Sequence, residues 1–282
     1  MKTIQLSHDD VLKILPNRDP FGHKGDYGKI LLICGSKGYT GAAALAAMGA
    51  LRCGAGLVYL GVPESIYQIE AIKLTEPIVF PLAEECGVLT EKAVEQISKR
   101  LLDVDAVLIG PGLGCNSGTF MMVKHVLRAY NGPVVLDADG INVLSGHIDV
   151  LRGRTGITVL TPHDGEFRRI GSDLTGDRMA AAGNFAADTN TIVLLKGHNS
   201  IITDGRSFYL NTTGNPGMAV GGSGDVLAGM ITALMGQGIA PLESAACGAW
   251  LHGAAGDLCA EEIGQYGMLP TDMLQVLPRL LK

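Results

Sequence analysis

Short apolar runs alternate with helix-like segments along most of this chain, and that alternation limits the folds it can adopt. Runs typical of buried strands occupy residues 29–34, 57–63 and 78–82, and others start at residues 106, 133, 157 and 191. Helical patterns occupy residues 42–52, 64–74, 89–101, 118–130, 178–190, 243–264 and 271–281. Strands that alternate with helices predict a mostly parallel sheet covered by helices on both faces. The expected fold class is therefore α/β, in three αβα layers.

The chain shows no internal boundary. Its 282 residues, 47% of them apolar, are enough for one large α/β domain, and no linker, low-complexity tract or short repeat divides them. We predict a single domain over residues 1–282, with an irregular leader at residues 1–28. Residues 201–211 predict a hairpin with Asp204 and Gly205 at its turn.

Charge and cysteine content exclude several classes of function. The net charge is −6, with acidic and basic residues mixed along the chain, which argues against a nucleic-acid partner. The six cysteines include no CxxC pair, so no zinc site is expected and the thiols are predicted to be reduced. The first 19 residues are too charged for a signal peptide, and no apolar run is as long as a membrane span. We therefore expect a cytoplasmic protein with no membrane partner.

A glycine-rich loop runs directly into a helix within residues 211–238. The sequence GGSGD is followed at once by VLAGMITALM, which has the apolar spacing of a helix. The open N–H groups and the dipole at such a helix start can bind an anion, and Gly222, Ser223 and Gly224 would form that cradle. Asp225 follows as a possible general base, and we expect the helix start to favour its ionised form. Alternatively, Ser223 or Asp225 is an ordinary N-cap and the glycines form a turn.

Polar or glycine-rich clusters follow the predicted strands and should gather at one edge of the sheet. In parallel sheets, ligands bind beyond the carboxyl ends of the strands. The clusters are GSKGYTGA, GPGLG, DADGIN, TPHDGEF and KGHNS. In DADGIN, Asp137, Asp139 and Asn142 suggest Mg²⁺ held partly through water, unless Asp139 only caps a short helix.

Three further segments each allow a binding or a structural interpretation. GPGLG, which contains Gly112 and Gly114, is either a binding loop or a plain turn. KGHNS begins with Lys196, which can meet a phosphate as a point charge, or the segment is a solvent-exposed turn. The small-residue helix around Ala42 either admits a ligand or packs tightly against a neighbouring element.

The stretch NTTGNPGMAVGGSGDVLAGMITAL resembles the signature of the ribokinase-like NAD(P)H-hydrate dehydratases. In that family the same unit also forms the C-terminal half of a bifunctional metabolite-repair protein. The family's motifs appear here in the same order between about residues 20 and 260. The resemblance implies a ribokinase-like three-layer fold, and no epimerase domain is visible in this chain.

The resemblance also implies roles for individual residues. Related kinases commonly carry an NxxE motif where this chain has His163 and Glu166, and the histidine is similar to the dehydratase subgroup. Asp225 is implied as the catalytic base, and Asp137 and Glu166 as supports for Mg²⁺. The implied substrate-binding residues are Ala42, Gly112, Gly114, His163 and Asp225. The implied nucleotide-binding residues are Lys196, Gly197, His198, Asn199, Ser200, Gly222, Ser223 and Gly224.

The implied activity is the dehydration of (S)-NADHX and (S)-NADPHX, the hydrated nicotinamide dinucleotides, to NADH and NADPH. The co-substrate would be ADP or ATP, with ADP favoured by resemblance, and the products would include phosphate and AMP. A homo-oligomer, with a tetramer favoured, is also implied. The alternatives are a small-molecule kinase of the same fold, acting on a hydroxymethylpyrimidine, thiazole or pyridoxal substrate, and a non-catalytic nucleotide sensor. His163 argues against the kinase, and Asp225 argues against the sensor.

Overall fold

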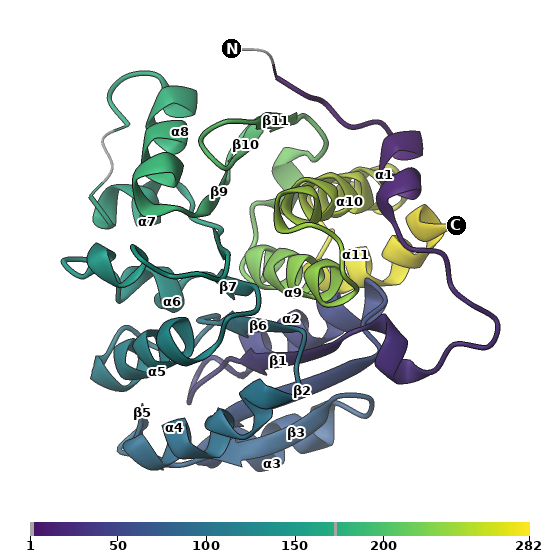
Figure 1. Ribbon diagram of the computed structural model, residues 1–282. Helices are drawn as coiled ribbons and strands as arrows, with labels where there is room; N and C mark the ends of the chain where they lie inside the picture. Colours follow the sequence, from purple (N-terminus) through teal and green to yellow (C-terminus); the bar gives the residue numbers. More distant parts are fainter. Residues whose placement is uncertain (1–2, 172–173) are drawn as a thin grey trace.

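The computed structural model describes residues 3–171 and 174–282 and has the predicted αβα layers (Figure 1). A nine-stranded sheet has the order β11-β10-β9-β8-β7-β6-β1-β2-β3. Its seven strands from β3 to β9 pair in parallel, whereas β10 pairs antiparallel with both β9 and β11. The bounds are β1 Lys29–Ile33, β2 Leu57–Pro63, β3 Ile78–Leu82, β6 Ala106–Ile109, β7 Val134–Leu136, β8 Thr158–Leu160, β9 Ile192–Leu195, β10 Ser200–Thr203 and β11 Phe208–Asn211. A separate small hairpin joins β4 (Glu84–Glu85) to β5 (Val88–Leu89).

Alternate residues of each central strand face opposite layers of helices, so both faces of the sheet are buried. In β1, Ile30 and Leu32 pack into the cluster that contains α2, α9 and α10, and Leu31 and Ile33 pack into the cluster of α4, α5 and α8. The first layer comprises α1 His8–Ile14, α2 Thr40–Arg52, α3 Glu64–Lys73, α9 Ser223–Gly236, α10 Pro241–Glu262 and α11 Pro270–Val276. The second comprises α4 Glu91–Ser98, α5 Ser117–Ala129, α6 Asp139–Asn142, α7 Asp164–Arg169 and α8 Arg178–Thr189. Short 3₁₀ turns are η1 Lys24–Tyr27, η2 Arg100–Leu102, η3 Ile148–Val150, η4 Pro216–Met218 and η5 Leu277–Leu281.

Most sequence predictions of elements are confirmed, and the differences have local causes. The hairpin β10–β11 forms, and the Asp204 carboxylate accepts bonds from two N–H groups in its turn. The prediction of an irregular leader at residues 1–28 is wrong for α1, which Ser7 and Asp10 start with a capping box and which buries Val11. The polar turn after β8 also contains a helix, α7, which the sequence interpretation missed.

The strand order brings the predicted polar clusters together at one edge of the sheet. The clusters that follow β9, β8, β7, β6 and β1 come from five adjacent strands. Helix α9 packs over β1, β6 and β7, and its first residues line the same cavity as the loop after β9. The glycine-rich loop therefore delivers Ser223 and Gly224 to the edge where α/β sheets bind ligands.

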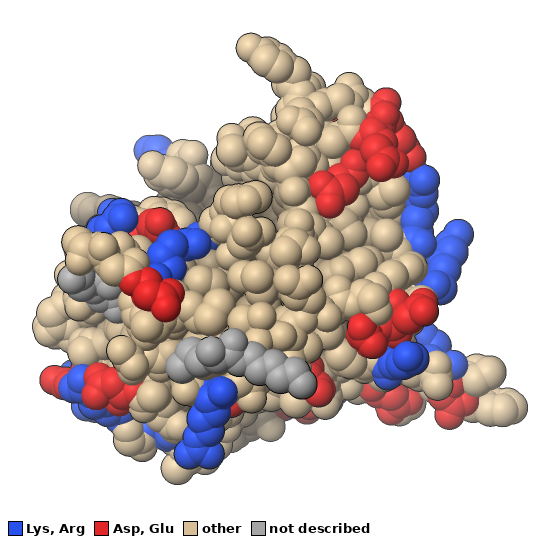
Figure 2. All heavy atoms as spheres, turned by 90° about the horizontal axis from the view of Figure 1, so that it is seen from above, with Lys and Arg blue, Asp and Glu red and all other residues tan. Residues whose placement is uncertain are grey.

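The surface agrees with the charge pattern of the sequence. The face in Figure 2 is largely free of charged side chains at its centre, and acidic and basic side chains are interspersed towards its margins. This face carries no continuous basic patch of the kind that binds nucleic acid. None of the helices within residues 3–171 and 174–282 is both long and apolar enough to span a membrane.

Candidate active site

The start of α9 has an open set of backbone donors. Gly222 is the N-cap residue and has a φ of +96°, and a side chain there would collide with Leu45. The N–H of Ser223 bonds to Val220, and the N–H of Val226 is the first to bond back to Gly222. The part of the chain that the structure describes provides no acceptor for the N–H groups of the two residues between them, Gly224 and Asp225. These two groups and the helix dipole suit an anion.

The alternative that Ser223 or Asp225 merely caps α9 does not describe this helix start. No side chain caps α9, because its N-cap position is a glycine. The Ser223 hydroxyl instead lies 3.3 Å from Nε2 of His252, a buried residue of α10. Burial lowers the pKa of His252 to about 4, so the imidazole is neutral at pH 7.

A cavity of about 800 Å³ opens beside this helix start. It brings together the loop after β9, the first two residues of α9, residues of α10, and the segment between β11 and α9. The predicted site residues that line it are His163, Lys196, Gly197, His198, Asn199, Ser200, Ser223 and Gly224. The predicted residues Ala42, Gly112, Gly114, Asp137, Glu166, Gly222 and Asp225 are outside this lining.

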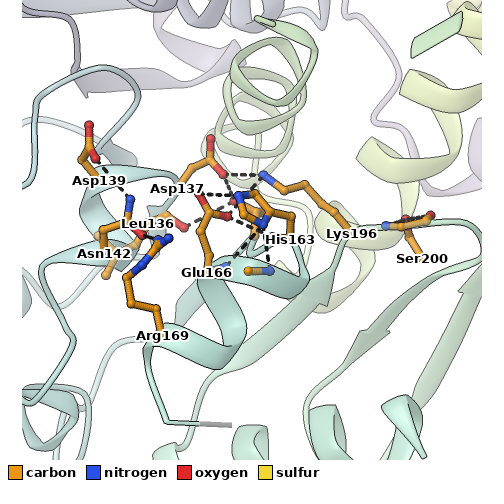
Figure 3. Close-up of polar contacts among 12 residues, drawn as sticks. Leu136, Asp137, Asp139, Asn142, His163, Glu166, Arg169, Lys196 and Ser200 are labelled. Atoms are coloured by element: carbon orange, nitrogen blue, oxygen red, sulfur yellow. Dashed lines mark hydrogen bonds and ion pairs between the residues drawn. The ribbon is translucent and has the colours of Figure 1, made fainter. Parts of the chain in front are cut away.

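Next to the cavity, four charged residues form what we call the acidic cluster: Asp137, Glu166, Lys196 and Asp225 (Figure 3 shows the first three). Lys196 Nζ lies 2.9 Å from Asp137 Oδ1 and 4.0 Å from Glu166 Oε2. Thr161 also donates to Asp137 Oδ1, at 2.7 Å. Burial alone would lower the pKa of Lys196, but the carboxylates of Asp137 and Glu166 raise it above its ordinary value. Lys196 is therefore a charged lysine that bonds to a carboxylate and also lines the cavity.

The pKa of Asp225 shifts in the direction opposite to the sequence-based expectation. Burial and the negative charge of Asp137 raise the pKa of Asp225 to about 6, although Lys196 opposes the shift. The sequence-based expectation was that the helix start favours the ionised form, but burial and neighbouring carboxylates outweigh the dipole and raise the pKa; most of the carboxyl group is nevertheless ionised at pH 7. A carboxylate whose pKa is near neutrality is well matched to general-base catalysis.

His163 is held in a defined orientation by the start of α7. Its Nδ1 accepts bonds from the N–H groups of Gly165, at 2.9 Å, and Glu166, at 3.3 Å, and the Glu166 carboxylate accepts the N–H of His163, at 2.9 Å. Because Nδ1 is an acceptor, the neutral ring carries its proton on Nε2. The side chain is 57% exposed and lines the cavity, and its Nε2 lies 3.5 Å from Glu166 Oε1.

The remaining predicted substrate residues form a second region, around the loop after β6. A side chain on Gly112 would come within 2.9 Å of the Ala42 methyl group, so these two residues face each other closely. The N–H of Gly114 donates to Asp139 Oδ2 at 2.8 Å, and Asn142 bonds to the other oxygen of this carboxylate. Asp139 therefore orders the loop and does not act as a helix cap.

The oxygen ligands at this edge suit a Mg²⁺ ion that is shared with a ligand. Asp137 and Glu166 are buried carboxylates, 1% and 5% exposed, and Mg²⁺ commonly takes one or two carboxylates together with phosphate oxygens and water. Within residues 3–171 and 174–282, no group of three or more His, Cys, Asp or Glu side chains could hold a metal ion. The residues therefore fit Mg²⁺ that arrives with a nucleotide, and not a preformed metal cage.

Sequence reasoning missed two parts of the cavity wall. His252 was hidden in a helical pattern, where a histidine is indistinguishable from a surface residue. The segment 212–220 was interpreted only as a flank of the glycine-rich loop, yet it lines a large part of the cavity. The asparagine, glycine and proline of GNPG signalled a turn, but not which helix the turn packs on.

A family model and the curated relatives of this chain indicate the same family. The family model of the NAD(P)H-hydrate dehydratases matches residues 30–279. The bifunctional NAD(P)H-hydrate repair enzyme Nnr of Moorella thermoacetica is 45% identical over 275 residues, which cover 95% of this chain and 52% of that protein. This chain thus spans about half the length of the curated relatives that it matches.

Two solved structures are similar to this chain in both fold and sequence. The ADP/ATP-dependent NAD(P)H-hydrate dehydratase of Bacillus subtilis, co-crystallised with ATP and Mg²⁺, is 32% identical with a TM-score of 0.85, over 99% of this chain and 98% of that one. A ribokinase-like superfamily protein of Enterococcus faecalis is 27% identical with a TM-score of 0.86, over 98% and 94% of the two chains.

Proposed function

The chain belongs to the NAD(P)H-hydrate dehydratase family, and from this premise we propose that it converts (S)-NADHX and (S)-NADPHX to NADH and NADPH at the expense of an adenine nucleotide. The observation that carries the proposal is the start of α9. There the open N–H group of Gly224, in the wall of the cavity, precedes Asp225, a carboxylate whose pKa is raised to about 6. A site suited to bind a phosphoryl group and a proposed general base are thus adjacent.

The need for a nucleotide follows from the leaving group. Hydroxide is a poor leaving group because water has a pKa of about 15.7. A phosphate monoester leaves more readily, because the second pKa of phosphate is about 6. In the proposed reaction the ring hydroxyl attacks the terminal phosphorus of ADP, AMP leaves, and the hydroxyl proton passes to Asp225. The ring nitrogen then expels phosphate by cleavage of the C–O bond, the neighbouring ring carbon loses a proton, and the ring double bond is restored.

Each group at the site has a role in this proposal. The N–H groups of Gly224 and Asp225 would bind the phosphoryl group that is transferred. Lys196 offsets part of the negative charge of Asp137 and Glu166 and lowers the pKa of Asp225, so that most of the Asp225 carboxyl group is ionised at neutral pH. The Nε2–H group of His163 would donate to the hydrated ring. Asp137 and Glu166 would hold Mg²⁺, which supplies neutralisation of phosphate charge when it is bound.

The substrate would extend from the acidic cluster towards the loop after β6. Ala42, Gly112 and Gly114 are proposed to contact the hydrated dinucleotide there, and the cavity would take the nucleotide through the loop that begins at Lys196. The cavity volume of about 800 Å³ is within the usual range for pockets that bind small molecules of this size. We propose ADP as the usual co-substrate, and a cytoplasmic homo-oligomer, with a tetramer favoured by the family resemblance.

The assay that tests the function supplies hydrated NADH, ADP and Mg²⁺ and follows the recovery of NADH absorbance. Dehydration should require the nucleotide and release one AMP and one phosphate for each NADH. Formation of a stable phosphate ester without recovery of NADH would identify a small-molecule kinase instead. Nucleotide binding without turnover of either kind would identify a sensor.

A further inference from the structure

One wall of the cavity is a segment that lacks regular structure apart from one short turn. Residues 212–220, which we call the strap, connect β11 to the glycine-rich loop before α9 and contain only the turn η4. Eight of the nine strap residues line the cavity: Thr212, Thr213, Gly214, Asn215, Pro216, Met218, Ala219 and Val220. The shape of the nucleotide cavity therefore depends on where the strap lies.

Asp257 of α10 holds the strap by two hydrogen bonds. Its Oδ2 accepts the backbone N–H of Gly214 at 2.9 Å, and its Oδ1 accepts the side-chain amide of Asn215 at 3.0 Å. The other end of that amide, Asn215 Oδ1, accepts the N–H of Gly217 and starts the turn η4. One carboxylate thus fixes both the path of the strap and the rotamer of the residue that shapes its turn.

The surface of α10 is shaped to receive the strap beside Asp257. A side chain on Gly253 would come within 2.2 Å of the Thr213 hydroxyl oxygen, so only glycine lets the strap approach this closely. The same hydroxyl donates to the Trp250 carbonyl at 3.0 Å. Gly253 and His252, one helical turn before Asp257, themselves line the cavity. Within residues 252–257 of α10, His252 and Gly253 therefore line the cavity, and Asp257 holds the strap that forms the adjoining part of its wall.

We propose that Asp257 is a positioning residue for nucleotide binding, which acts by latching the strap to α10 over the cavity. The inference rests on the proposed function, because it assumes that the cavity takes the nucleotide. Asp257 is not in the lining of the cavity, so its effect on the nucleotide would pass through Gly214 and Asn215. The hydrated dinucleotide, proposed to lie near Ala42 and Gly112, should be much less sensitive to it.

The test uses two variants and a matched control. Asp257→Ala removes both bonds, whereas Asp257→Asn keeps one acceptor oxygen and a similar shape. Glu261→Gln removes a carboxylate that is exposed on the same helix and bonds to no residue of the strap, all of which the structure describes. ADP affinity is measured by calorimetric titration without hydrate, KM values are measured for ADP and hydrated NADH, and melting temperatures are compared.

Asp257→Ala should weaken ADP binding and raise the KM for ADP by roughly tenfold to a hundredfold, on the order of the contribution of one hydrogen bond to a charged group. Asp257→Asn should show a smaller loss, and Glu261→Gln none. The KM for hydrated NADH should change by less than about threefold, which is well below the change expected for ADP.

The outcomes separate the inference from the function on which it rests. If the unaltered protein binds no ADP, the proposed function fails. If the unaltered protein binds ADP and both Asp257 variants bind it equally well, the latch is overturned. Equal losses for both substrates, or loss of the fold in both variants, would also overturn it, because Asp257 would then support the whole domain rather than the strap.

Discussion

The acidic cluster and the cavity proposed to bind the nucleotide are neighbours, but they are built differently. The cluster consists of buried or partly buried charged side chains that contact or influence one another, and burial together with these charges shifts the pKa of Asp225. The cavity is lined mostly by backbone groups and uncharged side chains of the strap, the loop after β9 and α10. This contrast implies a division of labour, in which the cavity binds by shape and backbone donors and the cluster transfers protons. Substitutions in the cluster should therefore change turnover more than nucleotide binding.

Asp225→Asn should give the largest effect. It keeps the shape of the side chain but removes the base, so turnover should fall by roughly 10²- to 10⁴-fold, the usual contribution of a general base. ADP affinity should be nearly unchanged, because the cradle is made of backbone groups. Turnover and ADP titration on the same preparation test this, with Glu261→Gln as the control. Near-normal turnover, or a matching loss of ADP affinity, would contradict the division of labour.

Lys196→Met should give the second-largest effect, and it should affect both the acidic cluster and the cavity. Loss of the cation leaves Asp137 and Glu166 without their partner, and the pKa of Asp225 should rise further because Lys196 no longer lowers it. Turnover at pH 7 should fall by roughly tenfold to a hundredfold, the loss of ionised base expected if the pKa of Asp225 rises from about 6 by roughly two to three units. The acid limb of the pH–rate profile should move to higher pH. An unmoved acid limb would separate Lys196 from Asp225.

The pH dependence of the unaltered enzyme offers a smaller, independent test. A raised carboxyl pKa means that the base is protonated, and inactive, below about pH 6. Turnover should therefore fall about tenfold as the pH falls from 7 to 5, because a single group with this pKa loses that fraction of its ionised form. Saturating ADP removes the contribution of nucleotide binding. Turnover that stays constant down to pH 5 would mean that Asp225 is not the base.

Substitution of His163 should give the smallest effect. It tests most sharply whether this residue serves hydrate binding rather than nucleotide binding. His163→Asn keeps an acceptor that can cap α7 but removes the Nε2–H group, so hydrate binding should weaken by about tenfold, as for the loss of one hydrogen bond. ADP affinity should change by less. His163→Ala also removes the cap and should lower the melting temperature in addition. Equal losses for ADP and hydrate in calorimetric titrations would place His163 in the nucleotide site.

The fold could be predicted because its sequence signals are local. Part of the site could not be predicted, because it depends on residues that are distant in the sequence. The apolar runs and the hairpin at Asp204 specify their own elements. The pair formed by Lys196 and Asp137 joins residues 59 positions apart and exists only because β7 and β9 flank the same strand. For the same reason, the local argument from the helix start gave the wrong direction for the pKa of Asp225. His252 and Asp257 carried no signal, because helical spacing predicts a helix and not the segment that packs on it.

The most direct measurement of the central claim follows the oxygen atom of the ring hydroxyl. Hydration of NADH in water that contains a heavy oxygen isotope places the label in that hydroxyl, and the labelled hydrate is then mixed with enzyme, ADP and Mg²⁺ in ordinary water. If Asp225 promotes phosphorylation of the hydroxyl and phosphate is then expelled, mass spectrometry should find the label in inorganic phosphate, one atom for each NADH formed. Label in the water with unlabelled phosphate would contradict this account, because the hydroxyl would then leave without ever being phosphorylated.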